Sequence, residues 1–138
     1  PSRLIDMGVE RYLLADALIG VLAQRLVPRL CPQCGTTGAT TSGEQQALSE
    51  GGVTLTGPVG RAVGCAACGH TGRKRRRPVC ELMVCTPDVR DQIGAGVAAS
   101  VLRARVAGEG WRSLRDDALE ASTRGEIDFS DAWRVADQ

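Results

Sequence analysis

At the start of the chain, apolar and polar residues recur with the spacing of an amphipathic helix. Its apolar positions, many of which recur after three or four residues, are Leu4, Ile5, Met7, Val9, Leu13, Leu14, Ala17, Leu18 and Val21. The pattern predicts a helix from about residue 3 to Gly20 with one face toward a core. Residues 21–27 are short and rich in β-branched side chains, so they fit either a helix or a strand leading into Cys31. Pro28 is expected to end either element.

The middle of the chain has no sustained periodicity. Residues 35–43 are small and polar, which predicts a loop, and a short helix is expected over residues 44–49. Residues 53–55 indicate a brief extended piece. The apolar run at residues 79–84 predicts a strand.

The last third of the chain has helical signals. Thr86, Pro87 and an acid at Asp88 predict a helix start. Apolar residues then recur every fourth position to residue 101, although Gly94 and Gly96 are expected to divide the segment in two.

Two further helices are expected near the C-terminus. One covers residues 111–123 and ends at Gly125, and the other is capped by Ser130. Trp111 and Trp133 are expected to anchor the core of this helical region.

Composition fits a globular protein: 138 residues, 43% apolar and 24% charged, enough for one modest core or two small ones. The longest apolar stretch, residues 12–30, is interrupted by charges and proline, which excludes a membrane span there. Net charge is only +1, so attraction to acidic partners must be local. The basic candidate is Arg73–Arg77, and the acid-rich residues 109–138 could face it or a neighbouring subunit.

Two Cys-x-x-Cys pairs carry the clearest chemistry in the chain: Cys31 with Cys34, and Cys65 with Cys68. This spacing can place four thiolates around one tetrahedral ion with no open position for water or substrate. The sequence therefore predicts a structural zinc site. The intervening residues 35–64 are longer than a usual zinc-ribbon connection and indicate an inserted loop or hairpin.

Other roles for these residues remain open. The four cysteines could form two disulfides or act as independent thiols, and one pair could be a thioredoxin-like redox motif, which does not call for a second copy. His70 could replace one thiolate as a ligand. Cys80 and Cys85 could be spare ligands or reactive thiols, but small buried residues are favoured.

Several segments, in order and with matching spacing, resemble the C-terminal part of the secretion ATPases that drive type II secretion and type IV pilus assembly. They are RLIDMGVE at 3–10, LIGVLAQRLV at 18–27, LCPxC at 30–34, GCxxCxxTG at 64–72 and EL at 81–82. The resemblance covers nearly the whole chain. After the second cysteine pair the chain departs from the family pattern, with Arg73, Arg75 and Pro78 making this region more basic.

The resemblance implies an α+β fold, mostly helical with a small zinc-bound β-ribbon. Residues 1–30 would be the edge of a RecA-like core, 31–85 the tetracysteine zinc module, and 86–138 a helical subdomain. Such ATPases form hexameric rings at the cytoplasmic face of the inner membrane and act on an inner-membrane platform protein. The family's phosphate-binding loop and its ATP and Mg ligands lie upstream of Pro1. We therefore expect a piece of a longer protein, without catalytic residues and inactive as an ATPase alone.

The basic run Arg73–Arg77 has three interpretations: a solvated edge, a contact for an anionic membrane surface or acidic partner, or a nucleic-acid contact. Aromatic residues make up only 3% of the chain, so no platform for stacking bases is evident. A freestanding zinc-ribbon nucleic-acid binder is the alternative to a secretion ATPase region. Arg25 could reach a nucleotide or a neighbouring subunit, but a structural role is favoured.

Overall fold

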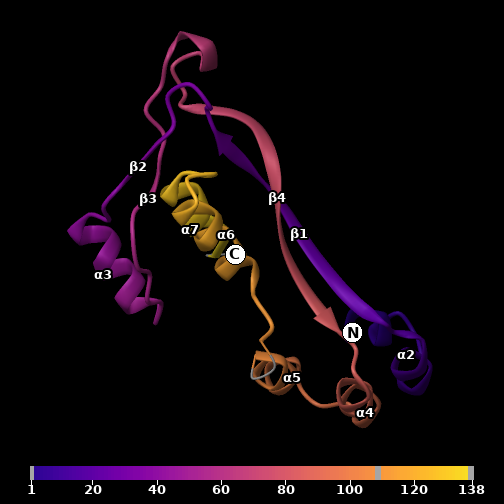
Figure 1. Ribbon diagram of the computed structural model, residues 1–138. Helices are drawn as coiled ribbons and strands as arrows, with labels where there is room; N and C mark the ends of the chain where they lie inside the picture. The colour runs from indigo at the N-terminus through magenta and orange to yellow at the C-terminus, as the bar shows by residue number, and fades with distance from the viewer. Residues whose placement is uncertain (1, 108–109, 137–138) are drawn as a thin grey trace. The chain divides into compact units, whose positions relative to one another are not determined.

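The computed structural model describes residues 2–107 and 110–136, and within them the fold mixes helices with two small sheets. These residues form seven α-helices, one 3-10 helix and four strands (Figure 1). The expected mixture of helices and a β-ribbon is confirmed, while the RecA-like character of residues 1–30 stays a prediction. None of the described helices is long and apolar enough to cross a bilayer.

The chain divides into two compact units, each assembled from separated segments. Unit 1 contains residues 1–23 and 81–113, and unit 2 contains residues 24–80 and 114–138. These units cut across the three contiguous stretches expected from the sequence. Whether residues 1–30, 31–85 and 86–138 act as functional domains stays a prediction.

The two longest strands pair with each other. Strand β1 (Gly20–Leu30) and strand β4 (Arg73–Val84) form a two-stranded sheet and run in opposite directions (Figure 1). The Cys31 N–H donates to the Gly72 carbonyl at 2.8 Å, and the Cys85 N–H donates to the Ile19 carbonyl at 3.0 Å. Residues 21–27 are therefore a strand, the second of the two forms that the sequence left open.

Pro28 lies inside β1, so the expectation that it ends the element is wrong. Both strands of a two-stranded sheet are edges, and a proline without an N–H is tolerated at an edge. The predicted strand over residues 79–84 is confirmed but begins earlier, because β4 starts at Arg73 and includes the whole basic run.

Unit 1 contains four short helices. They are α1 (Ser2–Asp6), α2 (Arg11–Ala17), α4 (Pro87–Ala95) and α5 (Ala99–Ala107). The single helix expected over residues 3–20 is wrong. Gly8 has φ of 92°, outside the right-handed helical region, and Glu10 is extended, so the chain turns between α1 and α2.

The helix start predicted at Thr86 is confirmed. The Thr86 hydroxyl accepts the Val89 N–H, Pro87 is the first helical residue, and Gly96 ends α4 in the left-handed conformation with φ of 72°. Because the helix stops there, only Val89 and Ile93 of the four-residue repeat are buried, while Val97 and Val101 are exposed.

Unit 2 contains the second sheet. Strand β2 (Thr36–Gly38) pairs antiparallel with β3 (Val59–Arg61), with Thr36 opposite Arg61 and Gly38 opposite Val59. The loop expected over residues 35–43 is therefore wrong in part, and residues 53–55 form no strand. Small polar residues carry little local strand signal, so the pairing depends on the distant partner.

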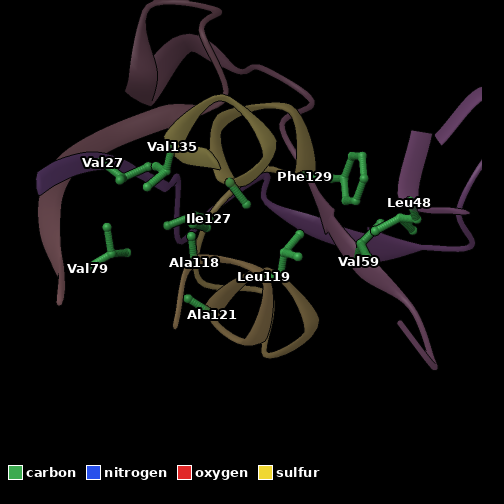
Figure 2. Packing of buried hydrophobic residues seen from close by; sticks show 11 residues of the cluster. Val27, Leu48, Val59, Val79, Ala118, Leu119, Ala121, Ile127, Phe129 and Val135 are labelled. Atoms are coloured by element: carbon green, nitrogen blue, oxygen red, sulfur yellow. The ribbon is translucent and has the colours of Figure 1, made fainter. Parts of the chain in front are cut away.

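The helices of unit 2 complete its core. They are α3 (Ser42–Glu50), the 3-10 helix η1 (Ala66–Cys68), α6 (Leu114–Thr123) and α7 (Phe129–Ala136). Figure 2 shows side chains of α3, β1, β3, β4, α6 and α7 gathered in one cluster, with Ile127 and Val59 fully buried. Trp133 packs against this cluster and Trp111 against that of unit 1, so both tryptophans support a core, although not the same one.

The cap of α7 differs from the expected one. Asp128, not Ser130, accepts at the helix start: its Oδ1 receives the Ser130 N–H at 2.9 Å and the Ser130 hydroxyl at 2.6 Å. Serine and aspartate are both good caps, so the sequence alone could not choose between positions two residues apart. The end of α6 before Gly125 is confirmed.

Candidate metal centre

The first cysteine knuckle follows strand β1 directly. Cys31 is buried, and the chain turns over residues 32–34 so that the Gly35 N–H donates to the Cys31 carbonyl at 2.7 Å. A Cβ at Gly35 would lie 2.7 Å from that carbonyl oxygen and 2.9 Å from the Leu30 Cβ. Only glycine allows so tight a return, which directs Cys34 back toward Cys31.

The second knuckle is built on η1. The Cys65 carbonyl accepts the Cys68 N–H at 3.1 Å and the His70 N–H at 2.9 Å, so the backbone curls around the two cysteines. Gly64 has φ of 108°, and a Cβ there would lie 2.6 Å from the His70 carbonyl oxygen. This close approach brings the entry and exit of the knuckle together beside Cys31 and Cys34.

The four sulfur atoms converge on one point. All four Sγ atoms lie within 4.8 Å of one another, and Cys68 Sγ is 3.8 Å from both Cys34 Sγ and Cys65 Sγ. A tetrahedral ion with Zn–S bonds of about 2.3 Å separates its sulfurs by about 3.8 Å, whereas a disulfide bond is about 2.05 Å long. All four cysteines are free, so the two-disulfide alternative has no support in this geometry.

Backbone N–H groups stabilise negative charge on the cluster. The Cys65 N–H and the Gly72 N–H each donate to Cys68 Sγ at 3.2 Å. Chiefly the hydrogen bond from the Cys65 backbone lowers the pKa of Cys68 to about 6. At Cys34, removal from water and the neighbouring thiols raise the pKa to about 12. A cation among the sulfurs favours all four thiolates at neutral pH, because its charge opposes their mutual repulsion.

The remaining candidate ligands lie outside this cluster. His70 is exposed and is not among the grouped ligand atoms of the described residues. Cys85 is buried in the core of unit 1, where burial raises the pKa of its thiol, which confirms it as a small core residue. Cys80 is half-buried, and its backbone N–H donates to Asp117 Oδ2 at 2.9 Å. Arg25 is half-buried on β1, and its role stays a prediction.

The knuckles are tied to α7 through Asp128. Its Oδ2 accepts the Ala62 N–H at 2.7 Å, two residues before Gly64, and its Oδ1 lies 3.6 Å from Arg73 Nη2, next to Gly72. Burial raises the pKa of Asp128, but hydrogen bonds from Ser130 and Ala62 outweigh this, so the net pKa is lowered. Asp128 therefore stays charged and contacts both segments that flank the second knuckle.

The predicted meeting of basic and acidic blocks is confirmed within unit 2. Arg73 Nε lies 2.6 Å from Asp131 Oδ2, and Arg77 pairs with Glu126 and, at 3.9 Å, with Asp117. Charge counting showed that the blocks could meet but not which residues would pair. The ion pair of Arg61 with Glu44, at 2.6 Å, was not predicted; the capping sequence Thr41-x-x-Glu44 was a signal that could have marked the acid, but not its partner.

The fold and the cluster together define a class: a mixed α/β region with a tetracysteine centre that can hold one metal ion. Comparison with known proteins identifies the family of the chain. Residues 1–134 match the family model described as Type II/IV secretion system protein, and the chain belongs to this family.

Three relatives illustrate the match. The type II secretion system protein HxcR of Pseudomonas aeruginosa is 37% identical over 97% of the chain, and the putative type II secretion system protein E of Escherichia coli K12 is 35% identical over 98%. The type IV pilus assembly ATPase PilB of Thermus thermophilus is 34% identical over 90% of the chain. The chain spans about a quarter of the length of the first two relatives, 25% and 27%, and 14% of the third.

Proposed function

We propose that this chain is a zinc-stabilised, non-catalytic region of an ATPase that powers protein secretion or pilus assembly. The observation that carries the zinc proposal is the convergence of four Sγ atoms, at separations that suit a tetrahedral ion. Cys31, Cys34, Cys65 and Cys68 would be its four ligands. A shell of four thiolates leaves no position for substrate, so the ion would hold structure and take no part in a reaction.

The ion would fasten the end of β1 to the start of β4. Cys31 directly follows β1, and four residues separate Cys68 from the start of β4. Structural zinc sites have apparent binding free energies on the order of 10–16 kcal/mol, comparable to a domain's net stability of about 5–15 kcal/mol. The metal would therefore decide whether unit 2 folds.

The ATP and Mg sites would belong to the parts of the parent protein that precede this region. No Gly-x-x-x-x-Gly-Lys-Ser/Thr sequence occurs in the 138 residues, so the chain has no loop of that kind to hold phosphates. As in the parent family, the whole protein would form a hexameric ring at the cytoplasmic face of the inner membrane. It would work there with a platform protein, and this region would contribute scaffold and contacts.

The apolar surface of unit 1 supports its placement at the edge of a larger, RecA-like core. Eleven of the thirteen large apolar side chains exposed in the described residues belong to unit 1, including Ile19 at 80% and Leu22 at 60% exposure. A concentration of exposed large apolar side chains in one unit is what an interaction site would show. We infer that the preceding part of the parent protein covers it.

Metal analysis tests the zinc proposal directly. The purified, reduced chain should contain one zinc per molecule by elemental analysis, and changing Cys31 to Ser should abolish it. Cys80→Ser is the matched control, because Cys80 lies outside the cluster and should leave the zinc content at one. Absence of metal from the reduced wild-type chain would overturn the proposal.

Activity assays test the second part. The chain alone should not hydrolyse ATP in the presence of Mg²⁺, whereas the same region within the parent protein should be needed for full activity. Steeply salt-dependent DNA or RNA binding by the chain, lost when Arg75, Arg76 and Arg77 are changed to Glu, would instead support the nucleic-acid alternative.

A further inference from the structure

The five basic residues at the start of β4 fall into two groups. Arg73 and Arg77 have acidic partners inside unit 2: Asp131 and Asp128 for the first, Glu126 and Asp117 for the second. Neither side chain is exposed by more than a third, at 33% and 18%. These two charges are balanced internally and contribute little to binding a partner.

The three residues between them have no such partners. Lys74, Arg75 and Arg76 are exposed, and their side chains form no ion pair or hydrogen bond with any residue in the described ranges 2–107 and 110–136. Three unbalanced positive charges on consecutive residues repel one another, and no carboxylate of the described residues pairs with them. An acidic partner would.

The backbone also changes at this point. Arg75 has φ of 66°, a left-handed conformation that a residue with a side chain rarely adopts. Backbone hydrogen bonds pair Cys31 with Gly72 at one end of the sheet and Ile19 with Cys85 at the other. Between these two pairs the chain of β1 advances 12 residues and the chain of β4 advances 13, so the β4 side contains one extra residue. Such a bulge interrupts the strict alternation of side chains between the two faces of a strand, and bulges are common next to functional sites.

The surroundings limit the size of the partner. Four carboxylates bracket the patch: Asp128 and Asp131 at Arg73, Asp117 and Glu126 at Arg77. Because each of these carboxylates is paired with Arg73 or Arg77, the unbalanced positive charge is confined to three consecutive residues. A bilayer or a nucleic-acid duplex is a broad negative surface that meets only this small area of positive charge, whereas a short acidic segment matches it in length. The aromatic residues of unit 2, Phe129 and Trp133, pack in its core and offer no exposed platform for bases.

We propose that Lys74, Arg75 and Arg76 form a docking surface for an acidic protein segment, a short stretch with several Asp or Glu side chains. Guanidinium groups bind carboxylates through two parallel hydrogen bonds, which suits the two arginines. The sequence indicated an acidic partner for the whole run Arg73–Arg77, and this proposal assigns the contact to its three central residues. It goes beyond the zinc proposal and does not depend on the ATPase activity of a parent protein.

The test compares charge reversals at two places in the zinc-loaded chain. The patch variant is Lys74→Glu, Arg75→Asp, Arg76→Glu, with Asp at 75 because it tolerates a left-handed backbone. The matched control is Arg3→Glu, Arg11→Glu, Arg103→Glu, three exposed residues of unit 1 with the same change in net charge. Zinc content and circular dichroism establish that each variant is folded. A neutral variant, Lys74→Gln, Arg75→Asn, Arg76→Gln, replaces any reversal that is not.

Binding is measured by fluorescence anisotropy with a labelled peptide of Glu, Asp and Gly. Parallel experiments use vesicles of phosphatidylcholine with phosphatidylglycerol, and duplex DNA. The patch variant should bind the peptide about tenfold more weakly than wild type, as expected for three exposed ion pairs, and the control should stay within about twofold. Equal peptide binding by wild type and patch variant overturns the proposal. So does patch-dependent binding of vesicles or DNA that is tighter than binding of the peptide.

Discussion

The two units of this chain bury apolar surface to very different extents. In the described part of unit 2, eleven buried apolar residues form one cluster that includes residues from β1, β3, β4 and three helices. The corresponding cluster of unit 1 has six buried residues. Unit 1 nevertheless carries most of the exposed large apolar side chains. Unit 2 therefore has a closed core and a cysteine centre, while unit 1 has a small core and an uncovered surface.

This difference indicates two sources of stability. Unit 2 combines its core with long-range connections: the sulfur cluster, the ion pairs of Arg73 and Arg77, and the Arg61–Glu44 pair. Unit 1 has fewer buried residues for its size, so the covering proposed above, by the preceding part of the parent protein, would supply more of its stability. Each unit contains one tryptophan, Trp111 in unit 1 and Trp133 in unit 2. Single-tryptophan variants can therefore report on each unit separately.

Removing the proposed metal should have the largest effect on the difference in stability between the two units. With a chelator, or in Cys31→Ser, the Trp133 signal should show unit 2 unfolded at room temperature, because the proposed zinc would contribute as much free energy as a domain's net stability. The Trp111 signal should change far less. Cys80→Ser should retain the wild-type signals. A chelated chain with an unchanged Trp133 signal would contradict a metal-dependent fold.

A cavity in the core of unit 2 should have the next largest effect. Ile127 is fully buried, so Ile127→Ala should lower the free energy of unfolding of unit 2 by about 2–5 kcal/mol. Urea titrations followed at Trp133 measure this. Val89→Ala, at a fully buried position of unit 1, is the matched control and should affect the Trp111 transition instead. If both variants shift both transitions equally, the two units unfold as one.

Removing the Asp128 carboxylate should have a smaller effect. Asp128→Ala loses the cap of α7, the acceptor for Ala62 and the contact with Arg73. We expect a loss of about 1–3 kcal/mol in the unfolding free energy of unit 2 and weaker zinc retention in competition with a chelator. Glu120→Ala, which removes an exposed ion pair with Arg124, should leave zinc retention unchanged.

The Arg61–Glu44 pair predicts a pH dependence. The hydrogen bond from Arg61 lowers the pKa of Glu44 from 4.5 to about 2. The pair therefore stabilises unit 2 fully above pH 4.5, and this contribution is lost as pH falls toward 2. Arg61→Met should lower the stability of unit 2 by about 1 kcal/mol at neutral pH. The difference from wild type, measured by urea titration at several pH values, should shrink below pH 4; a constant difference would contradict the assignment.

Changes on the uncovered surface of unit 1 should have the smallest effect. Leu22→Gln and Leu82→Gln should change the stability of this chain by less than about 0.5 kcal/mol, because both side chains are already exposed. In the longer parent protein the same changes should reduce stability or yield, if that surface is covered there. A large loss in the isolated chain would show that these residues are buried in solution.

Local signals in the sequence predicted several parts of this protein correctly. The start of α4 at Thr86, its end before Gly96 and the end of α6 before Gly125 depend on caps and glycines within one turn of the helix. The two Cys-x-x-Cys pairs predicted that four sulfurs would meet, since each pair is a local turn with little freedom. The family resemblance, which rested on segments containing these cysteine pairs and on residues 3–10, 18–27 and 81–82, is confirmed.

Only the tertiary structure decided features that depend on distant partners. The pairing of Thr36–Gly38 with Val59–Arg61, the acceptance of Pro28 within β1 and the break between α1 and α2 follow from contacts that short-range patterns do not contain. The same holds for the basic run Arg73–Arg77. Its sequence shows five positive charges without distinguishing them, and only the fold pairs two of them with carboxylates. Burial and ion pairing are properties of the folded neighbourhood, so residues adjacent in sequence can end in opposite environments.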